Sequence, residues 1–267
     1  MRALILAAGR GSRMGRCGDD RPKCLVELDG RPLIELQVAA LRRGGAAEIG
    51  IVRGYRAEML DVPDATYFHN ERWAETNMVG SLAAAAGWLR SGPLIVSYAD
   101  IFYHSDLVRG LLRAPGTLVI AYDRAWRSLW QRRFADPLAD AETFRIDARG
   151  DLQEIGGRTG RIEDIEGQYM GLLKFTPSAW RAVEALLAGL AQPVRDRLDM
   201  TGLLRRLLAG GTLRISTYGT HGQWGEIDSP ADLDVYRGML ASGELKLEDR
   251  LAEPDDSRET ARGYPWS

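Results

Sequence analysis

Apolar and polar residues alternate along the chain in a way that predicts strands and helices in turn. The apolar run at residues 3–8 predicts a buried strand that leads into glycines, and residues 32–45 carry apolar positions at helical spacing. The same patterns predict strands at 48–55, 65–69, 92–101, 117–123, 168–177 and 212–219, and helices at 76–92, 106–114, 177–190, 201–211 and 229–240. This order predicts an α/β fold with a doubly wound, mostly parallel sheet.

The stretch from residue 124 to residue 167 breaks this alternation. Residues 141–157, AETFRIDARGDLQEIGG, predict a β-hairpin with RGD at its turn, and the rest of the stretch is charged and irregular. Insertions of this kind commonly carry substrate selectivity on a rigid sheet. We therefore expect a single domain at 1–240 that includes this insertion, followed by a loose polar tail at 241–267.

Composition limits the classes of function. The 267 residues carry a net charge of −2, so no general affinity for nucleic acid or for an anionic membrane is expected. No apolar stretch approaches the roughly twenty residues of a membrane span, and the start predicts a strand rather than a signal peptide, which favours a cytoplasmic protein. Cys17 and Cys24 favour free thiols over one disulfide, and His69, His104 and His221 show no metal-ligand spacing.

A glycine-rich basic loop follows the first strand. In LAAGRGSRM, Gly9 and Gly11 leave backbone N–H groups with no side chain over them. A simple turn is the plain alternative, and a dinucleotide fingerprint fails because Met14 stands where the third glycine belongs. Because the basic residues Arg13 and Lys23 follow glycines at the end of a buried strand, where ligands collect in open α/β sheets, we interpret the loop as a cradle for a triphosphate.

Two aspartates end apolar runs: Asp100 in LIVSYAD and Asp228 in GQWGEIDSP. Each could be a cap, Asp228 of the helix that begins near Pro230 and Asp100 of a turn. A nucleoside triphosphate comes with Mg²⁺, which prefers one or two carboxylates together with phosphate oxygens and water. Beside the glycine loop, the two aspartates therefore predict a magnesium site.

These residues carry a family resemblance. LAAGRGSRM followed by RPKCLVELDGRPLIE resembles the signature of the nucleotidyltransferases of the sugar-phosphate pyrophosphorylase group, and the likeness continues through YAD and WGEIDSPADL to about residue 240. It implies the nucleotide-diphospho-sugar transferase (Rossmann-like) fold, with Arg13 and Lys23 on the phosphates and Asp100 and Asp228 on Mg²⁺. The nucleotide-binding residues that we expect are Leu6, Ala7, Ala8, Gly9, Gly11, Asn77 and Ser81.

Other segments narrow the resemblance. HNERWAETNMVGSL is similar to cytidylyltransferases that act on phosphocholine, phosphonates and related compounds, and EGQYMGLLKFTPSAW resembles the L-glutamine-phosphate cytidylyltransferases of bacterial capsule phosphoramidate pathways. The resemblance implies CTP as donor, a phosphorylated small-molecule acceptor and a CDP-linked product. A sugar-1-phosphate nucleotidyltransferase that uses UTP or dTTP is the alternative within the same chemistry, and a non-catalytic nucleotide sensor is the alternative outside it. The sequence leaves open whether the chain forms a homodimer.

The acceptor site is expected at or near strand ends, at Tyr98, Asp123, Trp126, Glu154, Tyr169 and Gly171. Trp126 and Trp130 lie four residues apart, which is typical of a core contact, while a cation–π wall for an ammonium group is the functional alternative. Arg132 and Arg133 could meet an acceptor carboxylate, although an exposed basic pair is commoner. Asn77 could cap a helix instead of binding the nucleotide.

Overall fold

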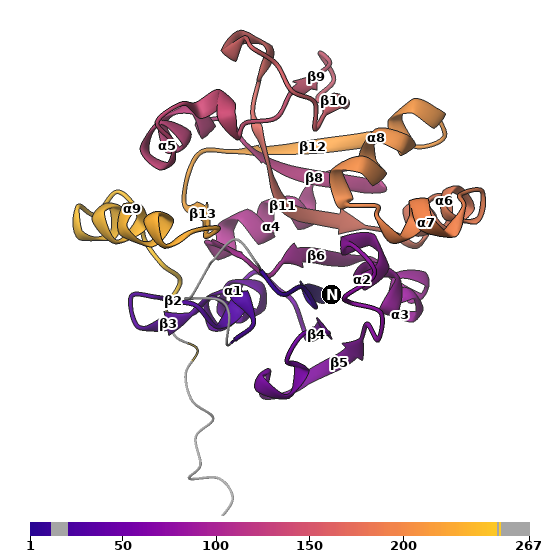
Figure 1. Cartoon of the computed structure of the whole chain (residues 1–267), viewed down its shortest axis with the longest axis horizontal. Coiled ribbons are helices and arrows are strands. Elements are labelled where there is room, and N and C mark those ends of the chain that lie inside the picture. Colours follow the sequence, from indigo (N-terminus) through magenta and orange to yellow (C-terminus); the bar gives the residue numbers. More distant parts are fainter. Residues whose placement is uncertain (12–20, 250, 252–267) are drawn as a thin grey trace, which may run out of the picture.

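The computed structural model describes residues 1–11, 21–249 and 251. Among these residues, seven strands form one central sheet, which Figure 1 shows with β12 at the top and β5 at the bottom. Side by side, the strands are β12 (Ile215–Thr220), β8 (Leu118–Asp123), β11 (Gln168–Phe175), β6 (Leu94–Tyr98), β1 (Arg2–Ala7), β4 (Glu48–Arg53) and β5 (Ala65–His69). The neighbours pair in parallel except for β11, which runs antiparallel to both β6 and β8.

Helices cover both faces of the sheet, because successive side chains of a strand point to opposite faces. In β1, Ala3, Ile5 and Ala7 belong to one buried cluster, whereas Leu4 and Leu6 belong to the other. The first cluster includes residues of α1 (Leu33–Arg43), α4 (Ser105–Arg113), α5 (Trp126–Arg133) and α9 (Pro230–Ala241), and the second those of α2 (Met78–Ala84), α3 (Ala86–Ser91), α6 (Pro177–Ala188) and α8 (Met200–Gly210). The prediction of a doubly wound, mostly parallel sheet is confirmed.

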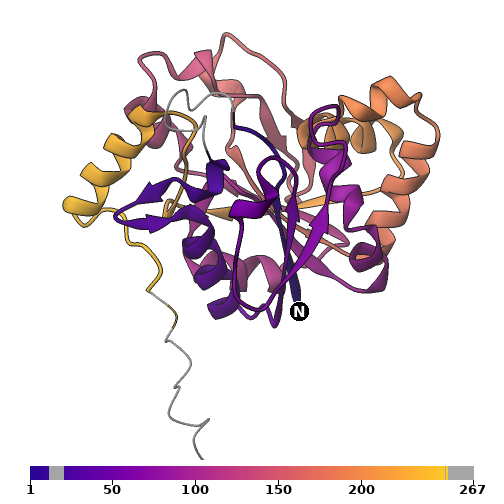
Figure 2. The ribbon, with the colours of Figure 1, turned by 60° about the horizontal axis from the view of Figure 1, so that its bottom comes forward.

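Figure 2 shows the orange helices α6 to α8 and the yellow helix α9 on opposite sides of the molecule. The short helix α7 (Gln192–Asp196) was not expected from the sequence. The predicted helix at 76–92 is two helices, α2 and α3, because the backbone of Ala85 (φ −101°, ψ 23°) leaves helical geometry between them. No described helix is both long and apolar enough to cross a membrane.

The antiparallel strand β11 explains where the insertion lies. β8 ends at Asp123 and β11 begins at Gln168, and these two residues are direct neighbours in the sheet. The chain between them therefore leaves the sheet and returns to it on the same side, the side where the parallel strands have their carboxyl ends. The predicted hairpin is confirmed as β9 (Phe144–Ile146) and β10 (Leu152–Ile155), but the expectation that the rest is irregular is wrong, because α5 and two short 3-10 turns, η4 (Pro137–Ala139) and η5 (Ile162–Asp164), lie there.

Small two-stranded sheets flank the central one. The predicted strand at 92–101 ends at Tyr98, and β7 (Ile101–Tyr103) pairs instead with β13 (Trp224–Glu226), antiparallel. The 3-10 turn η2 (Lys23–Leu25) precedes β2 (Glu27–Leu28), which pairs with β3 (Arg31–Pro32). One further 3-10 turn, η3 (Ala57–Met59), lies between β4 and β5.

The chain after α9 packs onto the domain. Leu245 is buried, and the buried Glu248 accepts a hydrogen bond from Ser105 N at the start of α4 (2.6 Å). The backbone carbonyl of Glu248 also accepts from Arg31. The expected loose tail at 241–267 is therefore wrong for Leu245 and Glu248, whose contacts extend the domain beyond residue 240; residues 252–267 lie outside the described part of the chain.

Gly225 lets two aromatic rings pack against β13. A Cβ atom at this position would lie 2.5 Å from Phe102 Cζ and 2.5 Å from Tyr236 Cε1. Because overpacking a tight core costs about 1–3 kcal/mol, we expect Gly225→Ala to lower the free energy of unfolding by that amount in urea denaturation. Gly238→Ala in the exposed part of α9, where an added Cβ meets nothing within 4 Å, is the matched control and should raise stability by about 0.5–1 kcal/mol. Equal stability of the two variants would contradict this packing.

Candidate active site

A cavity of about 260 Å³ lies where β1 and β6 end side by side. The chain continues from β1 toward β4 on one side and returns to β6 on the other, which is the switch point where open α/β sheets bind ligands. All seven residues expected to bind the nucleotide line this cavity, together with Lys23 and Asp100: Leu6, Ala7, Ala8, Gly9, Gly11, Asn77 and Ser81. Arg13 and Cys17 lie outside the described residues.

Gly11 brings the glycine loop close to Lys23. Its backbone is in the left-handed region (φ +68°), and a Cβ atom there would lie 2.9 Å from Lys23 Cβ. A glycine at this position therefore allows the loop to pass against the lysine side chain.

The polar groups of α2 have structural partners as well as a place in the cavity. Asn77 Oδ1 accepts from Met78 N (2.7 Å) as the N-cap of α2, so the capping alternative is correct for this residue. Ser81 Oγ accepts from Asn70 Nδ2 (3.1 Å) and is buried. Both residues therefore hold the helix start that faces the cavity.

The two aspartates meet at Lys23. Lys23 Nζ donates to Asp100 Oδ2 (2.8 Å) and to Asp228 Oδ1, and the three side chains are largely buried. The capping alternative for Asp228 is wrong, because α9 is capped by Ser229 and Asp232, and Asp232 accepts from the backbone N–H of Asp228 (2.9 Å). The carboxylate of Asp228 therefore does not cap the helix and pairs with Lys23 instead.

The turn that carries Asp100 is held from inside the fold. Gln37 of α1, which is fully buried, donates to the backbone carbonyls of Tyr98 (3.0 Å) and Ile101 on either side of the turn. Ile227 N donates to the backbone carbonyl of Asp100 (2.9 Å) and so ties the turn to the segment that carries Asp228. The separation of the two carboxylates is therefore set by buried backbone contacts.

A third carboxylate, that of Glu226, lies beside the two aspartates. One oxygen from each of Asp100, Glu226 and Asp228 lies within 4.8 Å of the other two. Burial, together with the negative charges of Asp100 and Asp228, raises the pKa of Glu226 to about 8, against the opposing effect of Arg133 and Lys23. Burial lowers the pKa of Lys23, but Asp100 and Asp228 outweigh it and raise the pKa above its ordinary value.

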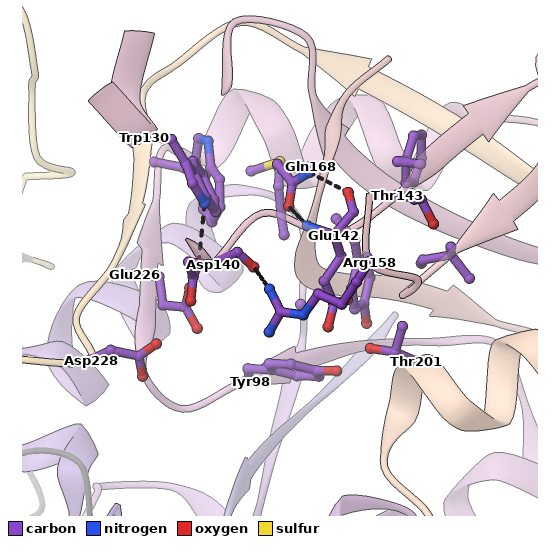
Figure 3. Close-up of a pocket in the computed structure, with 16 residues that line it drawn as sticks. Tyr98, Trp130, Asp140, Glu142, Thr143, Arg158, Gln168, Thr201, Glu226 and Asp228 are labelled. Atoms are coloured by element: carbon purple, nitrogen blue, oxygen red, sulfur yellow. Dashed lines mark hydrogen bonds between the residues drawn. The ribbon is translucent and has the colours of Figure 1, made fainter. Parts of the chain in front are cut away.

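A second cavity, of about 250 Å³, lies across Tyr98 from the first, and Tyr98 lines both. It is bounded by the insertion, by the start of β11 and by the segment that carries Glu226 and Asp228 (Figure 3). Three of the residues expected at the acceptor site line it: Tyr98, Tyr169 and Gly171. Gly171 (φ +74°) allows the Tyr98 ring to approach, because a Cβ atom there would lie 2.6 Å from Tyr98 Cγ.

The structure does not bring Asp123, Trp126 and Glu154 to this cavity. Asp123 is buried and accepts from Trp224 Nε1 (2.9 Å) and Ala125 N (2.8 Å), so its carboxylate satisfies donors inside the fold. Trp126 is a core residue, as its helical spacing from Trp130 allowed. Glu154 is exposed and lines a separate groove beside α8, while its neighbour Ile155 faces the cavity.

The alternative in which Arg132 and Arg133 meet an acceptor carboxylate is not supported by their placement. The Arg133 side chain is fully buried and pairs with Asp232 (2.8 Å), and Arg132 pairs with Glu244 (2.7 Å). Neither lines either cavity.

Several cavity residues were missed by the sequence analysis: Asp140, Glu142, Thr143, Arg158, Gln168, Thr201 and Glu226. A signal existed for three of them. Glu226 stands two residues before Asp228, and Glu142 and Arg158 flank the two ends of the predicted hairpin, where antiparallel pairing sets residues opposite each other. Thr143 N donates to the carbonyl of Gly157 (2.9 Å), which extends this pairing beyond β9 and β10.

The chain is similar in sequence to known proteins. Residues 3–197 match a family described as the MobA-like NTP transferase domain. The chain is 34% identical over 253 residues to the CTP:phosphoglutamine cytidylyltransferase of Campylobacter jejuni, covering 88% of this chain and 98% of that protein. It is 37% identical over 116 residues to the choline-phosphate cytidylyltransferase of Streptococcus pneumoniae, covering 41% of this chain and 51% of that protein.

A solved structure is similar in fold. The inositol-1-phosphate CTP transferase from T. maritima superposes with a TM-score of 0.68 at 18% identity, over 91% of this chain and 96% of that one. This likeness shows the fold alone.

Removing the lysine would leave two buried carboxylates facing each other. Since breaking a buried ion pair by removing one partner costs about 3–5 kcal/mol, we expect Lys23→Met to lower the free energy of unfolding at pH 7 by about that amount in chemical denaturation. Arg132→Met, which breaks the exposed pair with Glu244, is the control and should cost about 0–1 kcal/mol. A loss for Lys23→Met no larger than for the control would mean that the cluster does not hold these segments together.

Proposed function

Because the chain belongs to the family of MobA-like NTP transferase domains, we propose that it transfers a cytidylyl group from CTP to a phosphorylated small molecule and releases pyrophosphate. L-Glutamine phosphate is our first candidate for the acceptor, on the strength of the relative from Campylobacter jejuni, which matches almost end to end. The observation that carries the reaction type is the cluster of Lys23, Asp100 and Asp228 beside Tyr98, the residue shared by the two cavities.

The two cavities suit two substrates. In our proposal, the triphosphate lies against the glycine loop, where Gly9 and Gly11 present backbone groups, and the phosphorylated acceptor enters from the other side of Tyr98. An oxygen of the acceptor phosphate attacks the α-phosphorus of CTP, a new P–O bond forms, and the bond to the β-phosphate oxygen breaks as pyrophosphate leaves. Such a transfer depends on positioning and on neutralising charge rather than on a protein nucleophile.

Lys23 is placed to stabilise the charge that develops on the phosphates. Its raised pKa keeps the ammonium protonated, and it lies in the nucleotide cavity next to the loop. In the structure its ammonium group pairs with the two aspartates. When a triphosphate enters, the ammonium can exchange a carboxylate oxygen for a phosphate oxygen without leaving the cluster.

The carboxylates fit a magnesium ion. Asp100 Oδ1 is buried and has no hydrogen-bond partner among the described residues, and oxygens of Glu226 and Asp228 lie close by. Hard oxygen ligands of this kind are those that Mg²⁺ prefers. We propose that Asp100 and Asp228 hold the ion, which would supply positive charge to the reacting phosphate oxygens.

The reaction is tested by measuring pyrophosphate release with magnesium, each of CTP, UTP and dTTP, and a panel of phosphorylated acceptors. We expect release with CTP, reduced roughly 100-fold or more in Asp100→Asn and Asp228→Asn, because each removes a carboxylate that would hold the ion whose positive charge the reacting phosphates need. Asp234→Asn, on the exposed side of α9, is the control and should keep wild-type turnover. Release only with UTP or dTTP and a sugar phosphate would overturn the CTP proposal, and nucleotide binding without release would identify a sensor.

The metal proposal has a test that does not depend on turnover. In the absence of nucleotide, the ammonium of Lys23 competes with a cation for the oxygens of Asp100 and Asp228. We therefore expect Lys23→Met to bind Mg²⁺ at least severalfold more tightly than the wild type in calorimetry, although it turns over more slowly. Lys246→Met, at an exposed position, should leave the affinity unchanged; weaker binding by Lys23→Met would place the ion elsewhere.

A further inference from the structure

Arg158 presents a guanidinium group to the second cavity (Figure 3). Its Nη1 atom donates to three successive backbone carbonyls, those of Ala139 (3.1 Å), Asp140 (2.9 Å) and Ala141 (3.5 Å). One edge of the planar group is therefore fixed by the loop that precedes β9. The fork that remains is oriented in advance, which reduces the entropy lost when a ligand binds to it.

Among the described residues, no carboxylate oxygen lies within 4.0 Å of a nitrogen of Arg158. Arg132 and Arg133, in contrast, each pair with a carboxylate. Carbonyls satisfy the Nη1 donors, but they do not neutralise the charge. A positively charged fork that faces a cavity and has no ion-pair partner among the described residues is suited to an anion from a ligand, and its geometry matches a carboxylate.

Two acidic side chains, Glu142 and Asp140, line the same cavity as Arg158. Gln168 holds the backbone of Glu142 by donating from Nε2 to the carbonyl (2.7 Å) and accepting from the N–H at Oε1 (3.3 Å), so Glu142 is fixed in position. Burial raises the pKa of the half-buried Glu142 carboxyl, against the opposing effect of Arg158. Asp140 Oδ2 accepts from Trp130 Nε1 (3.1 Å). These two acids suit a cationic group of a ligand.

The hairpin explains why these charges face each other. Thr143 exchanges backbone hydrogen bonds with Gly156 and Gly157. Glu142, just before Thr143, and Arg158, just after Gly157, therefore both lie at the open end of the hairpin. Glu226 and Asp228 line the side of the cavity next to Lys23, and Asp140 is drawn between Glu226 and Arg158 (Figure 3). The cavity thus offers both charges that a zwitterion needs, and its side next to Lys23 suits a phosphate. Its volume of about 250 Å³ is small for a binding pocket and suits a small metabolite.

We propose that this cavity recognises its acceptor as a phosphorylated α-amino acid, with Arg158 binding the carboxylate and Glu142 and Asp140 binding the ammonium group. The inference rests on the proposed cytidylyltransferase function and assigns the specificity residues of its second substrate. Phosphocholine and aminoalkyl phosphonates carry a cationic group but no carboxylate, and sugar phosphates carry neither, so none of them uses Arg158.

The experiment removes the same contact from the protein and from the substrate. The acceptors are L-glutamine phosphate, the phosphate of 4-aminobutanamide, which lacks the carboxylate, and the phosphate of glutaramate, which lacks the amine. Because a hydrogen-bonded pair of charged groups is worth on the order of 10- to 100-fold, we expect Arg158→Met to lower kcat/KM by that factor with L-glutamine phosphate, mainly through KM, and to change it little with the acceptor that lacks the carboxylate. Glu142→Gln should show the corresponding selective loss for the amine.

Arg161→Met is the matched control, since Arg161 is exposed and follows Arg158 by three residues; it should behave as the wild type with all acceptors. Equal losses for Arg158→Met with every acceptor would overturn the inference and leave Arg158 as a tether of the loop. Turnover of phosphocholine or of a sugar phosphate in preference to L-glutamine phosphate would overturn it too, while the nucleotidyltransferase function would stand.

Calorimetry separates failure of the inference from failure of the proposed function. If no acceptor releases pyrophosphate from CTP, the proposed function fails. Binding of L-glutamine phosphate that is weakened by Arg158→Met and unchanged by Arg161→Met would still support the amino-acid site. Absence of binding to the wild type would overturn that site as well.

Discussion

The contact of Lys23 with Asp100 and Asp228 joins three distant parts of the chain, and the rest of the site depends on it. Each charged group comes from a different segment: the one after the glycine loop, the turn between β6 and β7, and the segment after β13. Buried charges need partners, since an unpaired charge in a protein interior is costly. The cluster therefore constrains where these segments lie, and its members line both cavities, Lys23 and Asp100 the first and Asp228 the second.

The direction of one strand decides where the second cavity is built. Because β11 runs against its neighbours, its first residues lie at the same edge as the last residues of β8, and the insertion between them is confined to that edge. The hairpin β9–β10 then brings Glu142 and Arg158 to the cavity that Glu226 and Asp228 also line. The first cavity thus comes from the central sheet and its loops, whereas the second is shared by the insertion, the start of β11 and the segment that carries Glu226 and Asp228. This division suits a family whose relatives carry names that point to different phosphorylated compounds.

More residues of the first cavity than of the second are predictable from the sequence, for a physical reason. Residues that line the first cavity through the backbone, such as Gly9 and Gly11, lie in one continuous loop after a strand, and their spacing is visible in the sequence. The second cavity is built from side chains of separate segments, and a strand end alone does not tell which way a side chain points. Asp123 lies at the expected strand end, yet its carboxylate turns inward to Trp224. Arg133 was considered for an acceptor carboxylate, whereas its partner is Asp232 of α9.

By itself, the sequence determined the alternation of strands and helices, the glycine loop, and the carboxylates that end two apolar runs, because these features depend on local periodicity and on short spacings. Only the tertiary structure decided that Lys23 lies between Asp100 and Asp228, that Glu226 joins them, and that Arg158 and Glu142 face one cavity. These outcomes depend on which strands become neighbours and in which direction they run. That choice is made by burial of the two apolar faces of the sheet over the whole chain, so no short segment contains it.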